Sequence, residues 1–461
     1  MKKNEEYIVN IIDNGFQGEG IAKIDDVIVF IDGAIKGEKI KIKLVKVLSG
    51  FCYGKILEII EGSENRREVE CSTYKKCGGC DLRHIKYEET LEIKRSIVEN
   101  CLYKALKREV KVMDVVGMDK PVFYRNKLQY PLGINDENKP VMGVFSSRTH
   151  DVIETKECFI QNEKCQQIAN EVFEHIKQNN ISIYNEKTLK GTVRHIIVRI
   201  GEKTKEIMVI LVVNENDVGA HNCAQIKNWT KLSENITKKY PEIKTIIKNI
   251  NNKNTNVIMG NKNEVIYGEG YIYDILGEYK FKISPNSFYQ INPIQTEKLY
   301  NTAIEFATNK NKENIALDLY CGIGTIGIFA SKQFKKIYGI EIVDEAVEDA
   351  KENARLNNIN NIEFFTGNVG EDSISALIEE IKPNTVFVDP PRKGLDGNTI
   401  ETLLKLEPEQ IIYISCNPST LARDIAKLEE KYELKQVSAA DMFPWTKHIE
   451  IITSLQLEKG L

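Results

Sequence analysis

The sequence of 461 residues has no long hydrophobic run, and that absence excludes whole classes of protein. No stretch approaches the roughly 18 consecutive apolar residues that a transmembrane helix needs. The opening residues MKKNEEYIVN carry no apolar segment behind their lysines, so we expect no secretory signal. Internal repeats and low-complexity linkers are also missing. With 42% hydrophobic and 28% charged residues, the composition is that of a folded globular protein with enough chain for several domains.

The chain also lacks a strong excess of either charge. It holds 63 Lys and Arg against 67 Asp and Glu, and the net charge of −4 by itself argues against a nucleic-acid partner. The mean hides an asymmetry, because residues 301–461 carry 17 basic and 26 acidic side chains while residues 1–300 carry 46 and 41. A net +5 in front and −9 behind indicates domains with different tasks. Since 51 of the 63 basic residues are lysine, codon bias explains part of this pattern.

Ten cysteines in a chain without a secretory signal indicate a reducing compartment, where metal binding or catalysis is commoner than disulfide formation. We therefore expect a cytoplasmic protein. Cys71, Cys77 and Cys80 lie within ten residues, and the Gly-Gly between the last two lets the backbone turn toward one metal centre. Cys158 and Cys165 are the nearest later cysteines that could supply a fourth thiolate. Four thiolates can hold zinc or an iron–sulfur cluster, and the tight triplet favours the cluster.

The pattern of expected secondary structure changes along the chain. Short β-branched runs with glycine-containing turns fill the first 62 residues and are typical of a small β-barrel. The next segment mixes helices and strands around the cysteine cluster. From about residue 314, strands and helices alternate, which predicts a parallel, doubly wound α/β domain. We predict three domains: a barrel at 1–62, a central α+β domain at 63–280, and a Rossmann-like α/β domain at 281–461.

Three strand ends of the last domain carry a nucleotide-binding pattern. A glycine-rich turn, DLYCGIGTIG, follows an apolar strand and opens a helix. It differs from the dinucleotide fingerprint because Tyr320 and Cys321 stand where the first glycine would be. Glu341 ends the next strand, where a carboxylate can accept both ribose hydroxyls, and a third strand ends in Asp389-Pro-Pro-Arg-Lys-Gly. Together these features predict an S-adenosylmethionine-dependent methyltransferase.

Two further strand ends carry reactive side chains. Cys416 follows an apolar strand at the edge of the sheet where ligands bind, so its thiolate could be a nucleophile; a buried structural cysteine is the alternative. Glu450 begins the last apolar strand, and its position predicts a buried, functional carboxylate.

As a set, these motifs resemble the RumA/TrmA-type RNA (uracil-5-)-methyltransferases. GFQGEGIAKIDDVIVFIDGAIKGEKI resembles a TRAM domain, a small RNA-binding barrel. The cysteine triplet, FYRNKLQY, SFYQIN, DLYCGIGTIG, VDPPRKG, SCNP and HIE then follow in the order of that family, so the resemblance covers essentially the whole chain. It implies methyl transfer from S-adenosylmethionine to C5 of a uridine in structured RNA, by a monomer that needs no membrane and no protein partner.

The resemblance also implies a role for each matching residue. Cys416 would add to uracil C6, and Glu450 would remove the C5 proton. The ligands of a [4Fe-4S] cluster would be Cys71, Cys77, Cys80 and Cys158, with Cys165 a bystander. The contacts to S-adenosylmethionine would be Gln290, Tyr320, Glu341 and Asp389.

Contacts to RNA are less specified by the resemblance. Arg125 could bind the substrate phosphate or base, and a surface arginine is the alternative. Phe443 and Trp445 could stack on a base that leaves its helix, and core packing is the alternative for Trp445. A TRAM-like segment together with the cysteine cluster favours 23S ribosomal RNA over transfer RNA. A non-catalytic RNA-binding iron–sulfur protein is the other hypothesis, and the presence of Cys416 and Glu450 argues against it.

Overall fold

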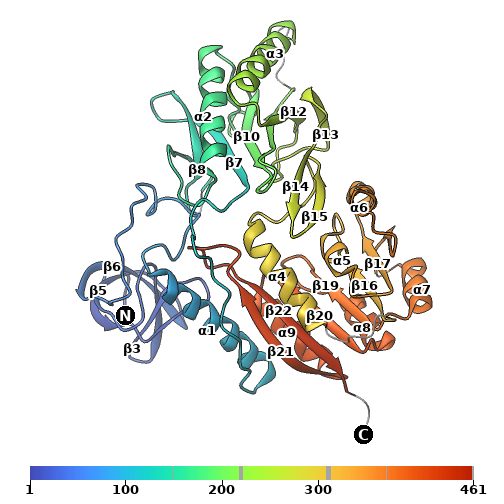
Figure 1. The fold of residues 1–461 in the computed structure, drawn as a ribbon. Coiled ribbons are helices and arrows are strands. Elements are labelled where there is room, and N and C mark those ends of the chain that lie inside the picture. The colour runs from blue at the N-terminus through green and yellow to red at the C-terminus, as the bar shows by residue number, and fades with distance from the viewer. Residues whose placement is uncertain (148, 217–221, 308–312, 370, 459–461) are drawn as a thin grey trace.

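The computed structural model describes residues 1–147, 149–216, 222–307, 313–369 and 371–458. The strands of these residues form three large sheets and one small hairpin, arranged along the chain from a barrel through a central sheet to a C-terminal sheet (Figure 1). None of the helices in this part of the chain is long and apolar enough to cross a membrane.

The N-terminal barrel is a curved sheet of six strands in the order β1-β5-β6-β4-β3-β2. Alternation of apolar and polar residues explains it, because the side chains of Ile40, Ile42 and Leu44 point inward and are fully buried. The predicted barrel is confirmed. Its strands are β1 (Glu6–Asn10), β2 (Asp13–Asn14), β3 (Gly20–Ile24), β4 (Val27–Ile31), β5 (Lys39–Val47) and β6 (Phe51–Glu61).

The central sheet has the order β13-β12-β11-β10-β7-β8-β9. Every residue of β10 and β11 is buried. The sequence of β11, IMVILVV, is wholly apolar, whereas β10 also buries Arg194, His195 and Arg199. The elements are β7 (Lys127–Ile134), β8 (Pro140–Phe145), β9 (Val152–Glu154), α2 (Glu163–Gln178), β10 (Val193–Ile200), β11 (Ile207–Val213), α3 (Asn222–Lys239), β12 (Ile243–Ile250) and β13 (Lys262–Gly268).

The C-terminal sheet is the predicted doubly wound α/β sheet, with the order β18-β17-β16-β19-β20-β22-β21. Its first five strands pair in parallel, and β22 inserts antiparallel between β20 and β21. The strand order reverses between β16 and β19, which is where such sheets bind ligands, beyond their carboxyl ends.

This part of the chain begins with the hairpin β14 (Ile272–Leu276) and β15 (Tyr279–Ile283), followed by α4 (Pro293–Phe306). The remaining strands are β16 (Ile315–Leu319), β17 (Lys336–Glu341), β18 (Ile362–Thr366), β19 (Thr385–Val388), β20 (Gln410–Ser415), β21 (Tyr432–Ala440) and β22 (Glu450–Leu457). The helices between them are α5 (Thr325–Ala330), α6 (Asp344–Leu356), α7 (Asp372–Ile381), α8 (Gly397–Leu406) and α9 (Pro418–Leu428).

Helix α1 (Tyr87–Leu106) connects the front of the molecule to this sheet. It follows the cysteine segment in the chain, yet it packs against α9 and lies beside β21 in Figure 1. Val98 and Leu102 of α1 are fully buried in the hydrophobic core of the C-terminal sheet. Helix α1, which follows the cysteine segment, is therefore packed into the C-terminal part of the fold.

Candidate functional site

The carboxyl edge of the C-terminal sheet brings three predicted residues together. The parallel register of β17, β16 and β19 places Glu341, Tyr320 and Asp389 side by side, one residue beyond the last pairs that join these strands. These three residues are far apart in the sequence but neighbours in space, because parallel strands align their carboxyl ends.

The glycine-rich turn after β16 has the open geometry that a nucleotide site needs. Tyr320, Gly322 and Gly324 all have positive φ, at 64°, 54° and 80°. A Cβ on Gly324 would lie 2.6 Å from Phe364, whereas one on Gly322 would meet nothing within 4 Å, so the turn is open there. The Glu341 Oε2 accepts a hydrogen bond from the Gly322 amide over 3.1 Å and can accept one more, while Oε1 already accepts from the Ile342 and Val343 amides over 2.8 and 3.0 Å.

Asp318 is a site residue to which the sequence motif gave no role. It is fully buried near the end of β16, and its Oδ2 accepts a hydrogen bond from the Gly327 amide over 2.9 Å. Within the described residues its Oδ1 has no hydrogen-bond partner. Burial raises the pKa of Asp318 to about 8, and the nearby charges of Asp389 and Glu341 add to the increase. The sequence feature that could have identified Asp318 is a carboxylate inside the otherwise apolar strand IALDL.

Gln290 and Asp389 converge on Tyr300, another residue that the sequence analysis missed. Asn292 caps α4 and so fixes the segment that carries Gln290, whose side chain is buried beside Tyr300. The Tyr300 hydroxyl lies 3.1 Å from Thr325 Oγ1 at the start of α5. Burial raises the pKa of Asp389 to about 7. No local pattern distinguishes Tyr300 from an ordinary apolar position of α4.

Cys416 and Glu450 face each other across two antiparallel strands. Ser415 of β20 pairs with Ile451 of β22, so the next pair in the same register is Cys416 and Glu450. Asn417 caps the helix that follows and Pro418 begins it, which explains why Cys416 sits at a helix N-terminus.

Burial and the same two charged neighbours control the protonation of both side chains. Burial raises the pKa of the Cys416 thiol to about 11, with further increases from Glu450 and Asp389, while Arg392 opposes them. Glu450 is 5% exposed, and burial followed by Asp389 raises its pKa well above the usual range, again opposed by Arg392. The site therefore holds protons that the reaction has to move.

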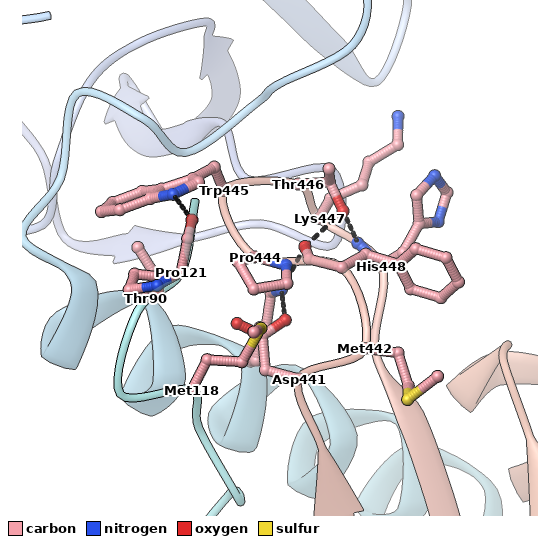
Figure 2. Close-up of polar contacts among 12 residues, drawn as sticks. Thr90, Met118, Pro121, Asp441, Met442, Pro444, Trp445, Thr446, Lys447 and His448 are labelled. Atoms are coloured by element: carbon pink, nitrogen blue, oxygen red, sulfur yellow. Dashed lines mark hydrogen bonds and ion pairs between the residues drawn. The ribbon is translucent and has the colours of Figure 1, made fainter. Parts of the chain in front are cut away.

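The loop 441–449 between β21 and β22 carries the predicted aromatic residues (Figure 2). Phe443 is half-buried, and its ring centre lies 5.9 Å from that of His448. Trp445 is only 3% exposed, and its indole N–H donates to the Pro121 carbonyl. Its ring packs with Met118, Tyr124 and Ile160, so of the two interpretations of Trp445 the structure favours core packing over base stacking.

The four predicted cluster cysteines lie together. Cys71, Cys77, Cys80 and Cys158 are free thiols that line one cavity of about 480 Å³. Cys165 lies instead in the core of the central sheet. Burial raises the pKa values of Cys77, Cys80 and Cys158, and neighbouring cysteines of the set add to each increase. In the described part of the chain, no three His, Cys, Asp or Glu side chains are arranged to hold a metal ion.

Two arginines border the cysteine cavity. Arg125, which the resemblance offered for RNA, lines this cavity, and it lowers the pKa of Cys77, Cys80 and Cys158. Arg83 lies over the Phe159 ring at 4.6 Å. Buried nitrogens of both arginines, Nε of each and Nη1 of Arg83, have no hydrogen-bond partner among the described residues.

Comparisons with known proteins identify the family of the chain. Residues 86–459 match the family model "tRNA (Uracil-5-)-methyltransferase", and residues 2–57 match the TRAM domain. A Clostridium acetobutylicum protein described as an uncharacterized RNA methyltransferase is 45% identical, covering 99% of this chain and 98% of its own. A Staphylococcus aureus protein with the same description is 44% identical, covering 99% of both chains.

A solved structure is also similar over nearly the full length. It is the Pyrococcus abyssi tRNA (uracil-54, C5)-methyltransferase in complex with S-adenosyl-L-homocysteine, with 27% identity, a TM-score of 0.76, and coverage of 97% of this chain and 100% of that one. The α/β fold class, the TRAM domain and S-adenosylmethionine as the cofactor are thereby confirmed. The chain belongs to the tRNA (uracil-5-)-methyltransferase family and is an S-adenosylmethionine-dependent RNA methyltransferase.

Proposed function

We propose that the protein methylates C5 of a uridine in structured RNA through a covalent adduct with Cys416. The observation that carries this proposal is the position of Cys416 opposite Glu450, beside the strand ends that carry Glu341, Tyr320 and Asp389. A nucleophile, a base and a nucleotide-binding edge are the three parts that C5 methylation requires.

The chemistry follows from the poor nucleophilicity of uracil C5. The Cys416 thiolate adds to C6, forming an S–C6 bond and moving the electron pair into an enolate that makes C5 nucleophilic. S-adenosylmethionine, when bound, supplies the electrophilic methyl group and leaves as S-adenosylhomocysteine. Glu450 then takes the C5 proton, the C5–C6 double bond re-forms, and the thiolate is released.

The residues around the thiol control its activation. A thiol whose pKa is about 11 is protonated at neutral pH, so its proton has to leave before the attack. Arg392 and the N-terminus of α9 favour the thiolate, and a cationic methyl donor beside Asp389 would offset the negative charges that oppose it.

The cofactor would lie along the carboxyl edge of the sheet. We assign Glu341 to the ribose hydroxyls, and Gln290, Tyr320 and Asp389 to the remaining contacts. Asp318 supports them by holding the glycine turn through the Gly327 amide. Phe443 would stack on the target base, which has to leave its helix to reach Cys416.

We assign a [4Fe-4S] cluster to the cysteine cavity, as the family resemblance implies. Four thiols that line one cavity of about 480 Å³ are a donor set for either zinc or a cluster, and the tight triplet in the sequence favours the cluster. A cluster with four thiolate ligands is anionic, and Arg83 and Arg125 offer buried nitrogens without partners at this cavity. The cluster would cross-link Cys71, Cys77, Cys80 and Cys158 and hold their segments together.

The proposed substrate is 23S ribosomal RNA, in line with the combination of a TRAM domain and the cysteine quartet. Transfer RNA is the second candidate, because a tRNA (uracil-54, C5)-methyltransferase has a similar fold over 97% of this chain. We assign RNA binding to the barrel at 1–62, the cluster to residues 63–280, and methyl transfer to residues 281–461. The whole protein is proposed to act as a cytoplasmic monomer.

The test is methyl transfer from labelled S-adenosylmethionine to 23S ribosomal RNA and transfer RNA from a strain that lacks the gene. Mass-spectrometric mapping should find 5-methyluridine in one of them. Cys416→Ala should abolish transfer and still bind S-adenosylmethionine, and Glu450→Gln should accumulate an RNA–protein adduct that survives denaturation. Activity in Cys416→Ala would refute the covalent mechanism, and methylation at another base position would refute the reaction.

A further inference from the structure

A buried ion pair anchors the loop 441–449, which is followed directly by Glu450 at the start of β22. Lys94 of α1 donates to Asp441 Oδ1 over 2.6 Å, and both side chains are fully buried. Asp441 directly follows Ala440, which pairs with Glu450 across the hairpin. The ion pair therefore lies where the two ends of the loop meet, so a shift of Asp441 would displace both ends.

Lys94 holds two points of the loop at once. Its Nζ also donates to the Phe443 carbonyl over 3.2 Å. The second oxygen of Asp441 accepts a hydrogen bond from the Tyr87 hydroxyl over 2.9 Å, and Tyr87 lies on the same helix. Helix α1 thus fixes Asp441, which begins the loop, and the backbone of Phe443, the residue proposed to stack on the target base.

Other segments hold the far side of the loop. The amides of Asp81 and Leu82 donate to the Trp445 carbonyl over 3.0 and 2.9 Å. The Tyr124 hydroxyl donates to the Pro444 carbonyl over 3.0 Å.

Neutral side chains share the near side of the loop with Lys94. Asn292 donates to the Met442 carbonyl over 3.0 Å, and Gln295 donates to the Asp441 carbonyl over 3.2 Å. Thr446 of the loop itself donates to the Phe443 carbonyl. Lys94 adds a charged contact that reaches the Asp441 carboxylate and the Phe443 carbonyl together.

Stability alone does not explain a buried lysine here. Removing two charges from water costs about as much as their attraction returns, and well-packed apolar side chains would join α1 to the loop equally well. What the ammonium group adds is a link between two points of the loop, because its several N–H donors reach a carboxylate and a backbone carbonyl at once. Apolar side chains would fill the space without making these two hydrogen bonds.

We propose that Lys94 is a positioning residue for catalysis. Through Asp441 and the Phe443 carbonyl, it sets the loop so that the target uracil is held against Cys416. This inference rests on the proposed uracil-5 methylation and adds a residue of α1, far from the reacting atoms, to the machinery that places the base.

The test is a trapping rate with RNA in which 5-fluorouridine replaces uridine. With fluorine at C5 there is no proton for Glu450 to remove, so the adduct with Cys416 accumulates after methyl transfer. The rate therefore reports base placement and thiol addition without the final elimination. Wild type should form the adduct, and absence of an adduct in wild type would refute the proposed function instead.

The variants are Lys94→Met/Asp441→Leu, which replaces the ion pair by apolar side chains, and the isosteric Asp441→Asn. Each should bind S-adenosylmethionine within about twofold of wild type and trap at least about tenfold more slowly. Lys248→Met is the matched control, because Lys248 bridges Glu215 and Glu264 in the central sheet. It should trap at the wild-type rate.

Circular dichroism and melting temperature separate placement from folding. Should the double variant fail to fold, Asp441→Asn alone decides. Trapping at the wild-type rate in a folded variant, or equal slowing in Lys248→Met, would overturn the role of Lys94.

Discussion

Cys416 lies opposite Glu450 in the register of β20 and β22, and the carboxylate of Glu450 raises the pKa of the Cys416 thiol. A nucleophile and a base that are neighbours cannot easily both be negative. The free protein therefore keeps protons at this site, and binding of a cationic methyl donor is the event that favours their release.

Replacing Glu450 by Gln should make Cys416 more reactive as a thiol while the enzyme turns over poorly. Loss of the neighbouring negative charge lowers the pKa of the thiol, so more thiolate is present at any pH below about 11. We expect alkylation of Cys416 by iodoacetamide at pH 8 to be about threefold faster or more. Mass spectrometry of the Cys416 peptide measures the rate.

Arg392→Ala is the converse variant, since Arg392 lowers the pKa of Cys416. It should slow alkylation at the same pH. An unchanged rate in both variants would show that neither charge acts on the thiol.

Asp318 should make the protein less stable as the pH rises. Its pKa is raised from 3.8 to about 8, so the folded protein holds a proton that the unfolded chain releases above about pH 4. Below about pH 4 the protonated Asp318 makes its full contribution to the free energy of unfolding. Between about pH 4 and pH 8 this contribution decreases, by at most about 1.4 kcal/mol per pH unit. Asp318→Asn should remove this dependence.

Urea unfolding of both proteins without cofactor, at a series of pH values between 5 and 8, measures the effect. The difference in unfolding free energy between Asp318→Asn and wild type should grow with pH. Parallel curves would contradict a raised pKa.

The two aromatic residues of the loop should behave differently. Trp445 is 3% exposed, so Trp445→Ala should destabilise the fold by about 3–5 kcal/mol. Phe443 is half-buried, so Phe443→Ala should destabilise the fold less than Trp445→Ala does. It should reduce the rate of adduct formation with 5-fluorouridine RNA more than Trp445→Ala does. Urea unfolding and the trapping assay give the two readouts, and the reverse order would place the base beside Trp445.

Anaerobic purification should yield a brown protein with iron and sulfide. Cys158→Ser should lose the visible absorption and most of the iron, because it removes one of four ligands. Cys165→Ala is the control, since Cys165 lies in the core of the central sheet and not at the cavity. One zinc per chain without visible absorption would contradict the cluster.

Local patterns were sufficient for much of the fold and for the centre of the site. Alternation of Ile and Lys predicted the buried face of β5, and an apolar run followed by glycines predicted the turn after β16. Glu450 was identifiable because a carboxylate begins an otherwise apolar strand. Cys416 directly follows the apolar strand β20, and there the family resemblance was needed to choose a nucleophile over a structural cysteine.

Contacts between distant segments could not be predicted in this way. Trp445 resembled a stacking residue until the fold surrounded it with Arg67 and Tyr87. Arg125 resembled a phosphate contact, and the structure places it at the cysteine cavity.

The sequence by itself determined the strand-end chemistry, because strand, turn and reactive residue are neighbours in the chain and parallel strands align their ends. Only the tertiary structure decided that Lys94 meets Asp441, residues separated by 347 positions. A lysine on an amphipathic helix is normally exposed to solvent, and no residue near Lys94 in the sequence indicates that it has a buried partner. Such a pair exists because α1 packs beneath the loop, and packing is a property of the whole fold.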